Sequence, residues 1–212
     1  MSCCLIVSGG CYVGKKSLKG KYDYIIACDK GFDHTISYKI KPDLVVGDFD
    51  SVSEENYKKI EKGKVKVIRF PKEKDDTDTM IAIKEALKLG YKSIDMICAL
   101  GNRTDHTLAN IQSAYYAVKK GATVKILGEN EELTFFKDKS MEFCGENASV
   151  ISVLSLGDKC EGVSISGTKY EAEDIELTGS FPLGISNEFV KKTAVVSVKN
   201  GSLMVIVSFK TS

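Results

Sequence analysis

Over residues 1–128, short apolar and partly β-branched runs alternate with stretches of helical periodicity, and this alternation then stops. The apolar runs are too short for buried helices and are typical of strands in a parallel sheet that is covered on both faces. The stretches between them carry apolar residues three and four positions apart, as at Ile83, Ala86 and Leu87. That spacing predicts helices, so this part of the chain predicts a mostly parallel sheet with flanking helices.

The limits of these elements follow from the same pattern. Gly63, Gly90 and Gly121 each come directly after a helical stretch, which is typical of helix C-terminal caps. We expect strands at 3–8, 24–28, 44–46, 65–70, 94–100 and 123–127, and helices at 53–62, 77–89 and 107–120. This order predicts a Rossmann-like α/β domain over residues 1–128.

Residues 129–212 have a different pattern. Short strand-like runs are separated by Gly, Ser and Asn turns, and Asn200-Gly201 predicts a hairpin. We expect strands at 133–136, 149–154, 162–166, 175–177, 193–198 and 203–209. Since none of these runs has the length or periodicity of a helix, residues 129–212 predict a small antiparallel β-sandwich domain.

Composition excludes several classes of protein. The longest apolar runs are strand-sized, so we expect no membrane span, and the N-terminus MSCCLIVSGG does not resemble a signal peptide. The seven cysteines form no C-x-x-C pair and there are only two histidines, so a zinc site is not expected and the protein is predicted to be reduced and cytoplasmic. A formal net charge of +1 and the lack of an aromatic and basic stripe exclude nucleic acid as an expected partner.

Polar motifs follow the predicted strands of the first domain or open its helices. The carboxyl ends of parallel strands converge on one edge of the sheet, where ligands bind. The motifs are Cys28-Asp29-Lys30-Gly31, Gly47-Asp48-Phe49-Asp50-Ser51, Lys74-Asp75-Asp76-Thr77-Asp78 and Gly101-Asn102-Arg103-Thr104-Asp105-His106.

The aspartates of these motifs favour a metal and phosphate site. Asp48 and Asp50 are two positions apart in an extended stretch, so both carboxylates point to one side, and a hard cation such as Mg²⁺ would stabilise them. A solvated turn is the alternative for this pair. For Asp75, Asp76 and Asp78 the alternative is capping of the following helix, because acidic residues complement the helix dipole.

Arg103 precedes a predicted helix, where its planar guanidinium can bind two phosphate oxygens. An ion pair with Asp105 is the alternative, and His106 is either a capping residue or a catalytic one. The stretch Gly9–Lys16 resembles a P-loop, but Lys16 stands where that motif needs Ser or Thr. We therefore expect no P-loop, although a glycine turn near phosphate remains possible.

Four motifs together resemble those of bacterial thiamine pyrophosphokinases, and they occur in the same order. They are Gly47-Asp48-Phe49-Asp50-Ser51, Lys74-Asp75-x-Thr77-Asp78, Gly101-x-Arg103-x-Asp105-His106-x-Leu108 and Gly184-Ile185-Ser186-Asn187-Glu188. The resemblance implies an α/β catalytic, nucleotide-binding domain at 1–128 and a β-sandwich, thiamine-binding domain at 129–212. It also implies a homodimer with active sites shared between subunits, and transfer of pyrophosphate from ATP to the thiamine hydroxyl, giving thiamine diphosphate and AMP.

The resemblance also implies a role for individual residues. The Mg²⁺ ligands of the family fall on Asp48, Asp50 and Asp78, with Asp29 beside them. By the same resemblance the catalytic residues are Asp78, Arg103, Asp105 and Lys74. The remaining substrate-binding positions fall on Thr77 and His106, and on Ser186 and Asn187 for thiamine.

Two other functions remain open from the residues alone. Another Mg²⁺-dependent phosphotransferase or phosphohydrolase would use the same aspartates without needing Ser186 and Asn187. A non-catalytic regulator that binds a nucleotide or a vitamin would bind ligand without turnover.

Overall fold

The computed structural model describes residues 2–18, 20–49, 52–62, 65–71, 75–101 and 103–210. The chain divides into two compact units, Met1–Glu129 (unit 1) and Asn130–Ser212 (unit 2). Among the described residues, no helix combines the length and the apolar character that crossing a membrane requires.

Unit 1 is an α/β unit whose paired strands are all parallel. Its strands lie in the order β6-β5-β1-β2-β3-β4. Along the chain its elements are β1 (Cys3–Val7), the 3₁₀ turn η1 (Lys15–Ser17), β2 (Tyr24–Cys28), α1 (Gly31–Tyr38), β3 (Leu44–Gly47), α2 (Glu54–Lys62), β4 (Lys66–Arg69), α3 (Asp78–Lys88), β5 (Ser93–Ile97), α4 (Thr104–Lys119) and β6 (Thr123–Leu127). The predicted parallel sheet with flanking helices is confirmed.

The direction in which strands are added reverses at β1. The chain adds β2, β3 and β4 on one side of β1, and then β5 and β6 on the other side. Connections that leave neighbouring strands in opposite directions open a crevice at the carboxyl ends of those strands, where ligands bind in open α/β sheets. The carboxyl ends of β1 and β5 are therefore the expected position of the site.

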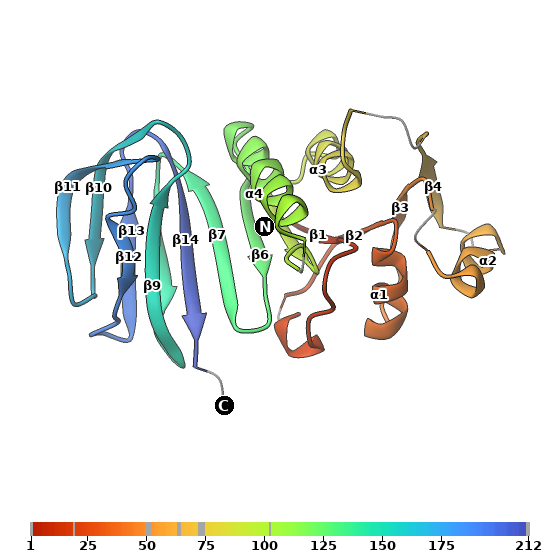
Figure 1. Ribbon diagram of the computed structural model, residues 1–212, viewed down its shortest axis with the longest axis horizontal. Coiled ribbons are helices and arrows are strands. Elements are labelled where there is room, and N and C mark those ends of the chain that lie inside the picture. Colours follow the sequence, from red (N-terminus) through yellow and green to blue (C-terminus); the bar gives the residue numbers. More distant parts are fainter. Residues whose placement is uncertain are drawn as a thin grey trace. The chain divides into compact units, whose positions relative to one another are not determined.

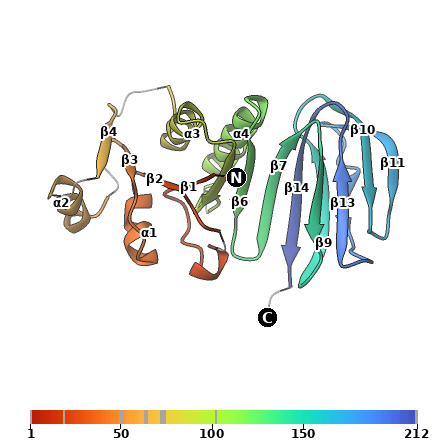
Figure 2. The ribbon, with the colours of Figure 1, turned by 180° about the vertical axis from the view of Figure 1, so that it is seen from behind.

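Helices cover both faces of this sheet. On one face, Leu5 and Val7 of β1 pack with Tyr38 of α1, and Ala27 and Val45 form a second cluster with α1 and α2. The helices α3 and α4 lie together on the opposite face (Figures 1 and 2). Because both faces are covered, β1, β2 and β3 are apolar runs, whereas β4, β5 and β6 also carry charged residues.

The structure corrects the prediction for unit 1 at one missing helix and at two element boundaries. The helix α1 was not predicted from the sequence. The helix α4 begins at Thr104 rather than at residue 107, and β5 ends at Ile97 rather than at residue 100. Gly90 and Gly121 follow the helices at φ +90° and +84°, as predicted for caps, whereas Gly63 lies outside the described residues.

Unit 2 is a sandwich of two antiparallel sheets, as predicted. Its elements are β7 (Glu131–Lys137), β8 (Ser140–Cys144), β9 (Ala148–Ser155), β10 (Lys159–Ser166), β11 (Ala172–Thr178), β12 (Gly184–Asn187), β13 (Thr193–Ser197) and β14 (Ser202–Phe209). One sheet has the order β12-β9-β14-β7 and the other β11-β10-β13-β8. Buried side chains from both sheets, such as Phe136, Val153, Val163 and Val196, form one core.

Two features of unit 2 differ from the prediction. The Asn200-Gly201 turn does not join a hairpin, because β13 pairs with β8 and β10 whereas β14 pairs with β7 and β9. The turn instead carries the chain from one sheet to the other, and Gly201 has φ +129°. The strands β8 and β12 were not predicted.

Candidate active site

A cavity of about 980 Å³ opens in unit 1 at the carboxyl edge of the parallel sheet. The residues after β1, β2, β3 and β5 line it, together with the first turns of α3 and α4. Its acidic and basic lining residues are Asp29, Lys30, Asp48, Asp75, Asp76, Asp78, Arg103 and Asp105. Residues from all four predicted motifs thus meet in one place, although they are spread over some eighty positions of the chain.

The turn after β1 lines the cavity. The backbone N–H groups of Gly10 and Cys11 donate to the carbonyls of Cys98 (2.8 Å) and Leu100 (3.1 Å), beyond the end of β5. A Cβ atom at Gly10 would lie 2.5 Å from the Cys98 oxygen, so only glycine fits this close approach. The glycine turn is therefore held against β5 by its backbone.

Asp29 and Asp48 follow adjacent strands and are brought close by the backbone. The N–H of Asp29 donates to the Val46 carbonyl (2.8 Å), and a Cβ atom at Gly47 would lie 3.1 Å from the Asp29 Cβ. Asp29 adopts φ 46° and Phe49 φ 68°, conformations that are uncommon for these residue types and that turn the chain sharply after each strand. Both aspartates are partly buried and line the cavity.

The acidic residues at the start of α3, which were predicted as one cluster, have different contacts in the structure. The Thr77 side chain accepts a hydrogen bond from the Met80 N–H (3.1 Å) and so caps the helix, of which Asp78 is the first residue. Asp76 accepts two hydrogen bonds from Lys84 (2.6 and 2.9 Å), and this ion pair satisfies its carboxylate. Asp75 is exposed and Asp78 is partly buried, and both line the cavity.

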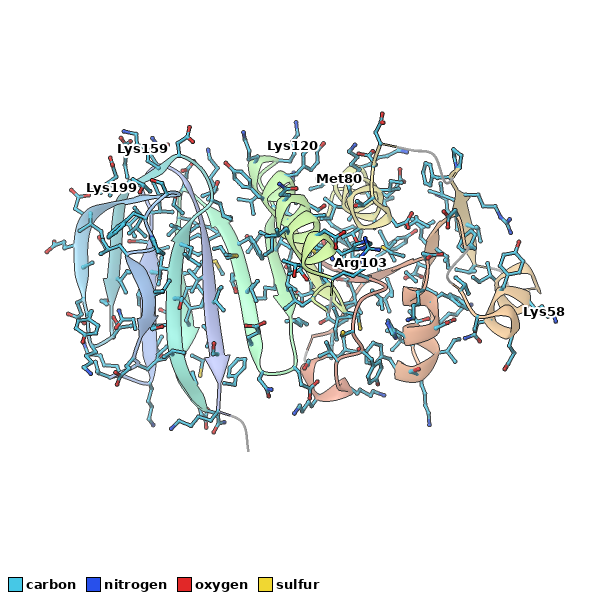
Figure 3. The ribbon with its side chains drawn as sticks, viewed as in Figure 1. Lys58, Met80, Arg103, Lys120, Lys159 and Lys199 are labelled. Atoms are coloured by element: carbon cyan, nitrogen blue, oxygen red, sulfur yellow. The ribbon has the colours of Figure 1, made fainter. Side chains whose placement is uncertain are left out.

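The start of α4 contributes Arg103, which Figure 3 shows at the opposite end of this helix from Lys120. The Arg103 guanidinium donates to both carboxylate oxygens of Asp105, and both side chains are exposed. These hydrogen bonds lower the pKa of Asp105 and raise that of Arg103. His106 is exposed and lines the same cavity.

Two buried contacts fix the helices that carry these side chains. The Asn110 side-chain amide donates to the Ala99 carbonyl (2.6 Å), which ties α4 to the end of β5. The Ser8 and Thr79 hydroxyls share a hydrogen bond (3.2 Å), which ties the end of β1 to α3. Both helix N-termini therefore have fixed positions relative to the strand ends.

Two residues of the cavity wall were not predicted. The His34 Nε2 lies 3.0 Å from the Gly10 carbonyl oxygen, and burial lowers the pKa of this imidazole. Because a carbonyl only accepts, Nε2 is assigned the proton. Tyr12 follows the glycine turn and is 49% exposed. The contacts of these residues lie far along the chain, so local sequence carries no signal for them.

Ser186 and Asn187 lie on β12 in unit 2. Pairing of β12 with β9 is irregular between Gly184 and Asn187, and Ser186 is exposed at φ 57°, with its N–H bonded to the Ser152 hydroxyl (3.0 Å). Irregular pairing of this kind re-aims side chains away from the sheet.

Asn187 is buried, and its amide makes four hydrogen bonds. Its oxygen accepts from the N–H groups of Tyr170 and Glu188 (both 3.0 Å). Its nitrogen donates to the Thr168 hydroxyl (3.1 Å) and the Tyr170 carbonyl (2.7 Å). Four bonds use the full capacity of a carboxamide, so Asn187 holds the 168–170 turn against β12.

Two predicted site residues, Asp50 and Lys74, lie outside the described residues. Among the described residues alone, no three potential ligands form a group able to hold a metal ion. The donor chemistry of the cavity nevertheless fits Mg²⁺, which prefers carboxylate oxygens. That ion is commonly bound by one or two carboxylates, several waters and substrate phosphates, so it needs no three-residue protein cage.

Comparison with known proteins agrees with this geometry. Residues 16–126 match the family described as thiamin pyrophosphokinase, catalytic domain, and residues 139–205 match the family described as thiamin pyrophosphokinase, vitamin B1 binding domain. The chain belongs to the thiamin pyrophosphokinase family. The predicted family and the predicted class of enzyme, an ATP-dependent diphosphotransferase acting on thiamine, are confirmed.

Individual relatives cover nearly all of the chain. The thiamine pyrophosphokinase of Bacillus subtilis (strain 168) is 29% identical over 182 residues, which are 85% of each protein. The crystal structure of the thiamine pyrophosphokinase from Bacillus subtilis superposes with a TM-score of 0.89 at 27% identity, covering 99% of this chain and 100% of that one. The structure of a thiamin pyrophosphokinase family protein from Enterococcus faecalis gives a TM-score of 0.83 at 27% identity, with both chains covered completely.

Proposed function

We propose that the cavity of unit 1 is the place where this thiamin pyrophosphokinase family member transfers the pyrophosphoryl group of ATP to thiamine, with the help of Mg²⁺. One observation carries the proposal: Asp29, Asp48, Asp78, Arg103 and Asp105 line a single cavity at the switch point of the sheet. These are the charged groups that phosphoryl chemistry requires, since its catalysis consists mainly of positioning and charge stabilisation.

Asp48 and Asp78, with Asp50, are the residues that would hold Mg²⁺. Asp48 and Asp78 come from the end of β3 and the start of α3 and line the same cavity, and Asp29 lies beside Asp48. The metal, when bound, supplies charge neutralisation at the phosphate oxygens. The backbone turns after β2 and β3 bring Asp29 close to Gly47, the residue before Asp48.

Arg103 would bind the phosphate chain, and Lys74 would assist it. In the structure Arg103 donates two hydrogen bonds to Asp105, and the same bidentate geometry binds phosphate oxygens. Since the pair is exposed, exchanging one anion for another costs little. The first turns of α3 and α4 also direct backbone N–H groups towards the cavity, where Thr77 and His106 would lie beside the substrates.

The reaction itself needs one bond to form and one to break. The thiamine hydroxyl oxygen forms a bond with the β-phosphorus of ATP, while the bond from this phosphorus to the oxygen shared with the α-phosphorus breaks. AMP leaves with that oxygen, and the proton of the hydroxyl passes to a carboxylate of the cavity. Charge builds up on the departing oxygen, which is where a guanidinium stabilises the transition state most.

Thiamine would be bound with the help of unit 2, around β12. Ser186 is exposed at the irregular pairing, and Asn187 holds the adjacent turn in place. The neighbouring segments carry several exposed apolar side chains, namely Tyr170, Phe181, Leu183, Ile185 and Val190. An exposed apolar surface of this kind is suited to covering by another molecule, so we propose a homodimer in which Ser186 of one subunit serves the active site of the other.

A cytoplasmic location belongs to the same proposal. All seven cysteines are free thiols, and Cys11 and Cys144 are exposed. Free exposed thiols are typical of proteins that work in a reducing compartment.

The test is a product analysis. The protein is incubated with ATP, Mg²⁺ and thiamine, and AMP and ADP are separated. We expect AMP and thiamine diphosphate in equal amounts and no turnover when Mg²⁺ is chelated. Formation of ADP and thiamine monophosphate would contradict pyrophosphoryl transfer, and hydrolysis of ATP without a thiamine product would indicate a phosphohydrolase.

A further inference from the structure

Tyr12 lines the cavity, and its aromatic ring is supported on one face by the protein. One face of its ring stacks on Tyr38, with ring centroids 4.9 Å apart and an angle of 22° between the planes. The residue nevertheless remains 49% exposed. One face of Tyr12 is therefore supported by the protein while the residue stays accessible.

The support beneath Tyr12 is rigid. Tyr38 is fully buried, and its hydroxyl donates to the carbonyl of Val13 (2.6 Å), the residue after Tyr12. The preceding glycine turn is fixed to the end of β5 through Gly10 and Cys11. The backbone on both sides of Tyr12 is thus anchored, so the ring loses little freedom when it contacts a ligand.

A second ring continues this surface. The ring of His34 lies 5.7 Å from that of Tyr12, tilted by 53°, and its Nε2 is bonded to the Gly10 carbonyl. Burial lowers the pKa of His34, so the imidazole is neutral at pH 7 and adds no positive charge beside Tyr12, although Lys30 also lines the cavity. Aromatic side chains bind a planar ring by stacking, whereas the guanidinium of Arg103 and a metal ion bind phosphate by charge.

The position of Tyr12 fits one part of the nucleotide. Tyr12 follows β1, whereas Asp29 and Asp48 follow β2 and β3, the next strands of the sheet. Neighbouring strands are about 4.8 Å apart, so roughly 10 Å separates the end of β1 from the end of β3. A nucleoside triphosphate has its ribose and α-phosphate between the base and the pyrophosphoryl group, and it can span this interval.

We infer that Tyr12 is the stacking platform for the nucleobase of ATP. The inference rests on the proposed function and extends it to the recognition of the base. Stacking on an aromatic ring accepts any base, because every base has a π-face. Tyr12 therefore strengthens nucleotide binding without selecting adenine over guanine.

The test compares ligands with and without a base. AMP and inorganic tripolyphosphate are titrated calorimetrically into the wild-type protein and into Tyr12→Leu, in which leucine still covers Tyr38 but offers no ring. We expect Tyr12→Leu to weaken AMP binding about 5- to 150-fold, and GMP binding by a similar factor. Tripolyphosphate binding should stay within about two-fold of the wild type, and Tyr12→Phe should retain AMP binding. Tyr91→Ala is the matched control, since Tyr91 pairs with Tyr24 at the amino-terminal edge of the same sheet and should leave both ligands unaffected.

Three results would overturn the inference: unchanged AMP binding in Tyr12→Leu, an equal loss of AMP and tripolyphosphate binding, or, in steady-state kinetics of the same variant, an increase of the KM for thiamine with an unchanged KM for ATP. The second would mean that Tyr12 shapes the phosphate site, and the third that the ring contacts thiamine. The binding measurements do not depend on turnover. A wild-type protein that binds AMP through Tyr12 but forms no thiamine diphosphate would therefore contradict the proposed function and leave this inference standing.

Discussion

Arg103 and Asp105 hold each other through two parallel hydrogen bonds, of 3.2 Å from Nε to Oδ1 and 2.7 Å from Nη2 to Oδ2. The two side chains are 69% and 65% exposed, so water solvates the pair and screens its attraction. The ion pair between Arg103 and Asp105, which we gave as the alternative to phosphate binding, is therefore present. It is compatible with phosphate binding, because both side chains line the cavity and the exposed pair is easily exchanged.

We expect Arg103→Lys to lower kcat about 100-fold, with a smaller effect on the KM for ATP. Lysine keeps the charge but loses the planar fork, and the loss falls on the rate because charge moves onto the departing oxygen in the transition state. Steady-state kinetics with varied ATP measures both parameters. Lys120→Gln, which removes a cation from the other end of α4, is the control and should stay within about two-fold. A wild-type kcat in Arg103→Lys would assign Arg103 a structural role only.

The same pair predicts a pH dependence. Hydrogen bonds from Arg103 lower the pKa of Asp105 below its unfolded value, so the stabilisation from the pair is complete above about pH 3.9 and is lost as the pH falls through the lower folded value. Asp105 therefore stays ionised throughout the neutral range. Carboxyl-carbon NMR titration should show the pKa of Asp105 rising towards about 3.9 in Arg103→Gln. An identical titration in the two proteins would mean that the pair does not persist in solution.

Much of the fold follows from local sequence. The strands β1, β2 and β3 are apolar because helices cover both faces of the sheet, and that composition is visible without a structure. The helix α1 was missed because it has only eight residues, lacks a side-chain N-cap, and ends at Lys39 in a left-handed conformation where a glycine would have marked the end. The strand β12 was missed because its register depends on Gly184, where a Cβ atom would lie 2.3 Å from the Val153 oxygen, and this contact is invisible in the sequence.

The site was predictable to the extent that its residues come at strand and helix ends. Asp29 and Asp48 could be grouped because parallel strands bring their carboxyl ends together, and Asp78 because it opens a helix that follows such a strand. Sequence could not separate Asp76 from that group, since its ion pair with Lys84 requires knowing that α3 places them together. Tyr12 was passed over because its surroundings resemble a P-loop, and its significance comes from a stack on Tyr38, 26 positions away.

We expect Asp48→Asn and Asp78→Asn to reduce turnover at least about 100-fold and to raise the Mg²⁺ concentration needed for half-maximal activity. Each change removes a charged ligand while keeping the shape of the side chain, so folding should be retained. The matched control is Asp76→Asn, whose carboxylate is engaged by Lys84 and which should keep activity within a few-fold of wild type. Magnesium titrations at fixed ATP and thiamine distinguish these cases. Equal losses in all three variants would show that the acidic cluster acts through its total charge.

Ser186 and Asn187, although adjacent, should respond differently to substitution. Asn187→Ala leaves buried groups of the 168–170 turn without partners and should lower the free energy of unfolding by about 1–3 kcal/mol. Ser186→Ala should leave stability within about 0.5 kcal/mol, because the side chain is exposed, and should raise the KM for thiamine but not for ATP. Urea denaturation and steady-state kinetics measure the two effects. A Ser186→Ala protein with an unchanged KM for thiamine would contradict a contact between this residue and the vitamin.

The last prediction concerns the sharing of active sites between subunits. If Ser186 of one chain serves the cavity of another, Asp78→Asn and Ser186→Tyr should each be inactive alone and should regain activity when their subunits are exchanged. Random mixing makes about half of the dimers heterodimers, and each of these has one site with both changes and one with neither. Sites with neither change should then make up about a quarter of all active sites in the mixture. They should have the KM values of the wild-type protein because their residues are unchanged. Exchange is verified first with two differently tagged wild-type chains. With exchange verified, a mixture as inactive as its components would show that each active site is built within one chain.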